Sequence, residues 1–149
     1  MISETRQNHP KTHNILLVED NQADILLTRE AFKESTVPHK MISVTDGVEA
    51  VSYLKRAGKY ADAVRPDIIL LDINLPKKNG FEVLEEIKQD PELKHIPSIV
   101  LSTSASKYDI RRAYELHANC YLIKPIELED FLRVIRSIED FWFNVATIP

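Results

Sequence analysis

Apolar residues occur in short runs that alternate along the chain with longer stretches of mixed apolar and polar residues. Five of these runs have the length of β-strands: residues 15–18, 41–44, 68–71, 99–101 and 121–123. The first, third and fourth runs are uninterrupted and rich in β-branched residues, which is typical of strands covered on both faces. The pattern therefore predicts a sheet whose inner strands are buried.

Five other stretches have the spacing of amphipathic helices: residues 22–34, 47–57, 80–89, 107–117 and 127–143. Asn21 precedes the first of them and is a predicted N-cap, because its side chain can accept a hydrogen bond from an unpaired backbone amide. Five repeats of a strand followed by a helix indicate right-handed crossovers and parallel strands. The predicted fold class is α/β, with a doubly wound, five-stranded parallel sheet.

The composition fits one globular domain. The chain has 149 residues, of which 44% are hydrophobic and 28% are charged, and its formal charge is −4. This length gives room for one core, and the negative charge disfavours a role in coating nucleic acid. No apolar run approaches the ~18 residues of a membrane span, and residues 1–13 lack the apolar stretch of a secretory signal. We therefore expect a cytoplasmic protein without nucleic-acid or membrane partners.

Rare residue types exclude several kinds of site. Cys120 is the single cysteine, so the chain cannot form an internal disulfide or a multi-cysteine metal site. Glycine occurs only at positions 47, 58 and 80, which excludes a G-x-G-x-x-G dinucleotide motif and a Walker loop.

Reactive side chains directly follow four of the predicted strands. These residues are Glu19 and Asp20 after the first strand, Asp72 after the third, Ser102 after the fourth and Lys124 after the fifth. The carboxyl ends of parallel strands share one edge of the sheet, so the five side chains should converge there. Clustered carboxylates without a nearby histidine favour Mg²⁺, and a cation beside a carboxylate nucleophile and a lysine suits phosphoryl transfer.

Each of these residues also has a purely structural explanation. Acids at strand ends often cap the following helix, a lysine before a proline can be a solvated turn residue, and Ser102 can bond to nearby backbone. The joint occurrence of all of them at successive strand ends favours a functional site over these separate explanations.

The ordered set of motifs resembles the receiver domain of two-component response regulators over residues 13–138. The matching segments are Ile15–Asn21, Leu70–Pro76, Ser102 and Tyr121–Pro125. The resemblance implies the (βα)5 flavodoxin-like receiver fold. Residues 1–12 would be a polar tail, and residues 139–149 would extend the last helix.

The resemblance also implies the chemistry of the site. Asp72 would be the phosphoacceptor for a histidine kinase. Glu19 and Asp20 would bind Mg²⁺ together with Asp72 and the backbone carbonyl of Asn74, and Lys124 would pair with the phosphoryl oxygens. The protein would then be a phosphoacceptor in signalling, and not an enzyme that acts on a separate substrate.

Three further residues belong to the implied mechanism. Ser102 would bind the phosphoryl group and form a switch pair with Tyr121, and the Lys124–Pro125 peptide bond would be cis. The sequence departs from the common pattern by carrying Glu19 for aspartate, Ser102 for threonine, and a longer loop over residues 56–65. None of these departures removes a group that the chemistry requires.

That loop, residues 96–101 and the aromatic carboxyl end resemble the single-domain regulators paired with cyanobacterial phytochromes. A phytochrome is therefore the expected kinase. Output would pass through protein contact, dimerisation or onward phosphotransfer.

The carboxyl-terminal helix predicts a homodimer. Its apolar stripe consists of Leu128, Phe131, Ile135, Ile138, Trp142 and Val145. Consecutive helical residues are about 100° apart, so the adjacent Phe141, Trp142 and Phe143 cannot all face one core. An exposed aromatic is a typical interface anchor, and these three residues are the predicted dimer contact.

Three other classes of protein fit these residues less well. A haloacid dehalogenase-like aspartyl-phosphate hydrolase needs a second acid two residues after its nucleophile, where this chain has Asn74. In a flavodoxin-like module, Glu19 and Asp20 would repel the FMN phosphate. A receiver-shaped adaptor that is never phosphorylated would not need the acids and Lys124 that are present here.

Overall fold

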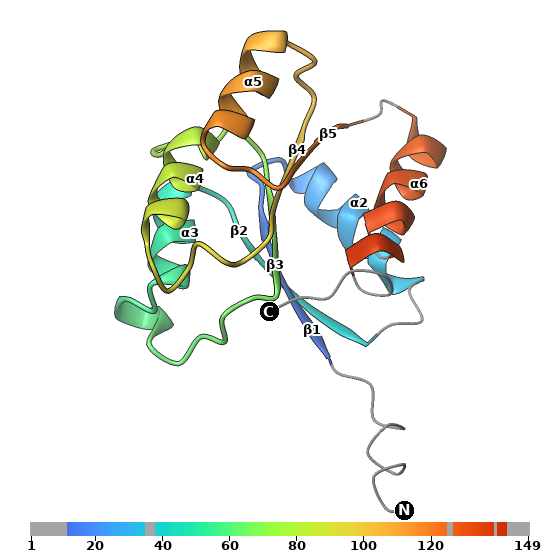
Figure 1. Ribbon diagram of the computed structural model, residues 1–149. Coiled ribbons are helices and arrows are strands. Elements are labelled where there is room, and N and C mark those ends of the chain that lie inside the picture. The colour runs from blue at the N-terminus through green and yellow to red at the C-terminus, as the bar shows by residue number, and fades with distance from the viewer. Residues whose placement is uncertain (1–11, 35–37, 125–126, 139, 143–149) are drawn as a thin grey trace, which may run out of the picture.

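Five parallel strands form one sheet in the computed structural model of the protein, which describes residues 12–34, 38–124, 127–138 and 140–142 (Figure 1). The strands are β1 (His13–Val18), β2 (His39–Val44), β3 (Ile68–Leu71), β4 (Ser98–Ser102) and β5 (Cys120–Ile123). Their spatial order is β2-β1-β3-β4-β5. The order reverses beside β1, so the carboxyl ends of β1 and β3 flank the point at which open α/β sheets bind ligands.

Helices cover both faces of the sheet, which confirms the doubly wound fold (Figure 1). One face carries α2 (Gln22–Lys33) and α6 (Leu128–Ile138), and the other carries α3 (Gly47–Leu54), α4 (Gly80–Gln89) and α5 (Lys107–Glu115). Successive residues of β1 enter opposite cores, with Leu16 among α3 and α4 side chains and Leu17 among those of α2 and α6. β3 and β4 are buried along their whole length, as their apolar runs predict.

Side-chain caps fix where several helices begin. The Asn21 side chain accepts a hydrogen bond from the Asp24 amide at 3.0 Å, which confirms the predicted N-cap of α2. Asp46, Asn79 and Ser106 cap α3, α4 and α5 in the same way. These caps satisfy backbone amides of the first turns that have no partner within the helix.

Two helices, α3 and α5, end two or three residues earlier than the sequence pattern predicts. α3 ends at Leu54 and α5 at Glu115, because Arg56 and His117 then adopt positive φ angles of 56° and 71°. α6 is described over Leu128–Ile138, and residues 140–142 are π-helical. The periodic pattern continues past the ends of α3 and α5, so it could not reveal these local breaks.

The predicted extra loop at residues 56–65 lies between α3 and β3. It contains the short helix η1 (Gly58–Tyr60), and the Tyr60 ring meets that of Tyr53 edge-on with centroids 5.2 Å apart. The Tyr53 hydroxyl also donates a hydrogen bond to the Val64 carbonyl at 3.2 Å. The loop is thus tied to α3 and does not contribute to the carboxyl edge.

Gly80, the first residue of α4, packs directly against the backbone that follows β3. Its amide donates a hydrogen bond to the Ile73 carbonyl at 2.8 Å. A Cβ atom at this position would lie 2.3 Å from the Asp72 carbonyl oxygen and 2.6 Å from the Ile73 Cα atom. Only glycine therefore lets α4 approach the end of β3 this closely.

We predict that Gly80→Ala lowers the free energy of unfolding by about 2–4 kcal/mol, because backbone must move to make room for the methyl group. Gly58→Ala is the matched control. Gly58 has a φ of 58° and no atom near its Cβ position, so that change should lower the value by only about 1–2 kcal/mol. Urea unfolding measures both, and equal losses would contradict the close packing at Gly80.

Candidate functional site

Three carboxylates that the sequence predicts to converge do so at the carboxyl edge of the sheet. Val18 pairs with Leu71 across β1 and β3, so Glu19 and Asp20 emerge beside Asp72. Carboxylate oxygens of these three acids lie within 4.8 Å of one another. Glu19 and Asp72 are buried, whereas Asp20 is exposed. Like charges at this distance repel one another, so the cluster favours the presence of a cation.

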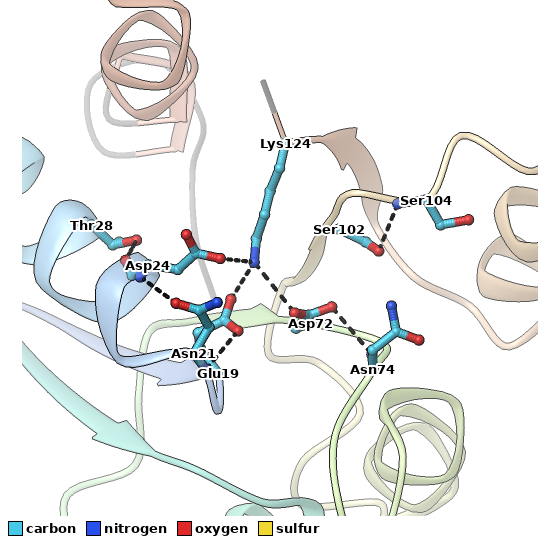
Figure 2. A network of polar contacts seen from close by, with 9 residues as sticks. All are labelled: Glu19, Asn21, Asp24, Thr28, Asp72, Asn74, Ser102, Ser104 and Lys124. Carbon is cyan, nitrogen blue, oxygen red and sulfur yellow. Dashed lines mark hydrogen bonds and ion pairs between the residues drawn. The ribbon is translucent and has the colours of Figure 1, made fainter. Parts of the chain in front are cut away.

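Lys124 supplies one positive charge to the buried acids (Figure 2). Its amide donates a hydrogen bond to the Ser102 carbonyl at 2.7 Å, which fixes the residue at the end of β5. Its side chain, only 5% exposed, places Nζ in contact with Glu19 and 3.3 Å from Asp72 Oδ2. The predicted convergence of Lys124 with the acids is thus confirmed in space.

Burial and charge perturb both partners of the central ion pair. Burial raises the pKa of Glu19 to about 7, against the hydrogen bond from Lys124, and the nearby charge of Asp72 raises it further. Burial by itself would lower the pKa of Lys124, but hydrogen bonds to Glu19 and Asp24 and the charge of Asp72 raise it above its usual value. Lys124 therefore keeps its charge, whereas Glu19 takes up a proton at a higher pH than an exposed glutamate does.

Asp24 is a fourth acid in this network, and sequence reasoning missed it. It lies in the first turn of α2, and its Oδ2 atom lies 2.9 Å from Lys124 Nζ. An acid at this position normally indicates only a favourable interaction with the positive end of the helix dipole. The available signal was its place in the sequence, since Asp24 lies in the first turn of the helix that begins just after β1 and its two acids.

Asn74 lies in the loop that follows Asp72. Its amide donates a hydrogen bond to Asp72 Oδ1 at 3.2 Å, while Lys124 contacts Oδ2. Both oxygens of the Asp72 carboxylate are thus held, one by backbone and one by a cation. This places Asn74 beside Asp72, and the role of its carbonyl as a metal ligand stays a prediction.

Ser102 and Tyr121 meet at one residue that the sequence did not single out, Ser104. The Ser104 amide donates to Ser102 Oγ at 3.1 Å, and the Tyr121 hydroxyl donates to the Ser104 carbonyl at 2.7 Å. The Ser104 hydroxyl donates to Asp109 of α5 at 2.7 Å. Ser104 therefore links the end of β4 to both β5 and α5, and a pattern of apolar runs gives no sign of such a link.

Several predicted features lie outside the described residues, namely most of the polar tail, the cis bond at Pro125, the contact of Phe143 and the place of Val145 in the apolar stripe. Nearby, Phe141 is 52% exposed and its ring meets that of Trp142 edge-on, with centroids 5.2 Å apart. Trp142 is partly buried against the core formed by α2 and α6. One large aromatic thus stays on the surface, as the helix geometry requires.

The donor set fits a divalent cation. Glu19, Asp20 and Asp72 offer only carboxylate oxygens, and among the described residues no histidine or cysteine joins the group. Hard oxygen donors, one of them at an exposed position, suit Mg²⁺ or Mn²⁺ better than zinc. The acids could therefore hold such an ion together with water.

Comparison with known proteins agrees with the geometry of this site. A family model described as the response regulator receiver domain matches residues 15–136, and the chain belongs to that family. It is a signalling protein that accepts a phosphoryl group. Its partner is a histidine kinase, and its cofactor is a divalent metal ion. The hydrolase, flavin-binding and unphosphorylated alternatives are not favoured.

Two relatives within this family are similar to the chain over nearly its full length. The response regulator Rcp1 of Synechocystis sp. is 49% identical over 142 residues, which cover 95% of each chain. The crystal structure of the phosphorylated cyanobacterial phytochrome response regulator RcpA superposes with a TM-score of 0.91 at 54% identity, covering 93% of this chain and 99% of the other. The Mn²⁺-bound form of Rcp1 has a TM-score of 0.88 at 49% identity, covering 92% and 99%.

No helix in the described ranges combines the length and the apolar character needed to cross a bilayer.

We predict that Glu19→Gln stabilises the metal-free protein at pH 8. The pKa of Glu19 rises from 4.5 to about 7 on folding, so its contribution to stability is fully present below pH 4.5 and is lost as the pH rises through about 7. The neutral amide should therefore raise the free energy of unfolding by about 1–3 kcal/mol at pH 8 and have little effect near pH 4.5.

Urea unfolding in the presence of a chelator at both pH values measures this difference. The exposed Glu30 on α2 provides a control, since Glu30→Gln should change stability by less than about 0.5 kcal/mol. A Glu19→Gln variant that is less stable than the parent at pH 8 would show that the ion pair with Lys124 outweighs the burial of charge.

Proposed function

We propose that this protein is a single-domain response regulator that takes a phosphoryl group from a phytochrome histidine kinase onto Asp72, with Mg²⁺ as its cofactor. The pairing with a phytochrome is supported by the likeness to RcpA and Rcp1 over nearly the full length of each chain. The observation that carries the assignment of Asp72 is its position, buried between Lys124 and two further acids.

In the proposed reaction, an Asp72 carboxylate oxygen attacks phosphorus. A new O–P bond forms as the P–N bond of the kinase phosphohistidine breaks, and the bonding electron pair stays on the imidazole nitrogen. Glu19, Asp20, Asp72 and the Asn74 carbonyl would hold Mg²⁺. When bound, the ion supplies positive charge to the phosphoryl oxygens.

Lys124 has two roles in this reaction. Before transfer it neutralises the buried acids, and its Nζ already lies 3.3 Å from Asp72 Oδ2. After transfer its ammonium group is within reach of the new phosphoryl oxygens and pairs with them. The side chain needs little movement between these two roles, which favours a charge-assisted contact with the phosphorylated residue.

Ser102 and Tyr121 form the proposed switch. After phosphorylation the Ser102 hydroxyl would turn to donate a hydrogen bond to the phosphoryl group and give up its bond with the Ser104 amide. The Tyr121 hydroxyl is held by the carbonyl of that same Ser104, so a shift of this residue would reach β5 and α5.

Output would pass through a second copy of the chain or another protein. Phe141 and Trp142 are the described members of the predicted dimer contact, one exposed and the other partly buried. We propose a homodimer through this segment that phosphorylation tightens, in a cytoplasmic protein that acts on no separate substrate and binds neither nucleic acid nor membrane.

We predict that Asp72→Asn abolishes phosphorylation by acetyl phosphate or by a phytochrome kinase in the presence of Mg²⁺. An amide oxygen is a poor nucleophile and carries no charge to balance the ion. Intact-protein mass spectrometry detects the added phosphoryl group directly. Asp62→Asn, at an exposed loop position, is the control and should be labelled like the parent protein. Undiminished labelling of the Asp72→Asn protein would refute the assignment.

We predict that Phe141→Ser weakens dimerisation of the phosphorylated protein by about tenfold or more, because aromatic anchors dominate protein interfaces. Val64→Ser removes another exposed apolar side chain, from the loop tied to α3, and should leave the dimer intact. Light scattering over a concentration series measures both. A phosphorylated parent protein that stays monomeric at about tens of micromolar would exclude the dimer.

A further inference from the structure

The position of Asp24 distinguishes it from the other acids around Lys124. Lys124 Nζ contacts three carboxylates among the described residues, namely Glu19, Asp24 and Asp72. Glu19 and Asp72 belong to the group whose oxygens could share one metal ion, whereas Asp24 does not. Asp24 reaches the ammonium group from α2, on the side away from Asp72 (Figure 2).

We propose that Asp24 is a positioning residue that keeps Lys124 in an ion pair when Glu19 and Asp72 bind a divalent ion. The inference rests on the proposed function, since it concerns the same metal and phosphoryl site. Asp24 contacts neither phosphoryl group nor metal in this scheme. It acts only by holding the ammonium group that later meets the phosphoryl oxygens.

Two hydrogen bonds fix the backbone of Asp24, and its carboxylate is held by Lys124 Nζ at 2.9 Å. Its amide donates to Asn21 Oδ1 at 3.0 Å, and its carbonyl accepts a hydrogen bond from Thr28 Oγ1 at 2.7 Å. Its side chain is 30% exposed, against 5% for Lys124. An acceptor at the rim of the site can thus hold the buried lysine without entering the metal group.

Charge accounts for the need for such a residue. Lys124 and a divalent cation compete for the same oxygens of Glu19 and Asp72, and the two cations repel each other. Without Asp24, binding of the ion would leave a buried ammonium group with no described partner, which is a strongly unfavourable state. With Asp24, the same event leaves one ion pair intact. Asp24 therefore favours metal binding without being a metal ligand.

Calorimetric titration with Mg²⁺ alone tests this proposal. We expect Asp24→Asn to weaken Mg²⁺ binding by about tenfold, less than the loss of a fully buried partner would cause, because the Asp24 side chain is 30% exposed. Asp24→Glu keeps the carboxylate and should recover most of that affinity. Glu30→Gln removes the same charge from an exposed position on the same helix and should change the affinity by less than about twofold.

Nitrogen-15 spectra of lysine-labelled protein give a second result that a merely structural role would not produce. With Mg²⁺ bound, the Lys124 ammonium signal should persist in the parent protein, Asp24→Glu and Glu30→Gln but vanish in Asp24→Asn. Without Mg²⁺ it should be present in all four. Its loss in Lys124→Ala assigns the signal.

The outcomes separate this inference from the proposed function. An Asp24→Asn protein that binds Mg²⁺ as tightly as the parent, or that keeps the Lys124 signal in the metal-bound state, would overturn the role of Asp24 and leave Asp72 as the phosphoacceptor. A parent protein that binds no Mg²⁺ would overturn both the inference and the proposed cofactor.

Discussion

One buried ammonium group among acids is the interaction on which this site depends. Lys124 contacts Glu19, Asp24 and Asp72 at the edge of the sheet, and Asp20 lies beside them. One positive charge cannot balance four carboxylates, so the site attracts further cations. Burial is the main cause of the raised pKa of Glu19, and the nearby charge of Asp72 raises it further. A metal ion and a lysine together can then stabilise the phosphoryl group that no carboxylate cluster would accept alone.

The sheet makes this arrangement possible. Side chains from β1, β3 and β5 can converge because parallel strands end at one edge and the order reverses beside β1. The helices that follow must then begin close to the same edge. Gly80 permits this for α4 through a contact with the Asp72 backbone that a Cβ atom would prevent, and Asn21 caps α2 so that Asp24 faces Lys124. Fold and site thus share the same few residues.

The sequence alone predicted most of the fold, because buried parallel strands such as β3 leave an unmistakable apolar run. It also located Asp72, Glu19 and Lys124, since a residue directly after such a run must lie at the sheet edge. It missed Asp24 and Ser104 for a physical reason. Their roles depend on the direction of a side chain from a helix turn and on backbone groups in a loop, and neither is encoded in periodicity.

The central claim is that Asp72 carries the phosphoryl group while Lys124 holds its oxygens. The most direct test is a crystal structure of the protein with Mg²⁺ and beryllofluoride, a stable mimic of the phosphoryl group. The account predicts beryllium bonded to an Asp72 carboxylate oxygen, with Lys124 Nζ within about 3 Å of a fluoride. Beryllofluoride bonded to another residue, or a Lys124 side chain turned away from the fluorides, would contradict it.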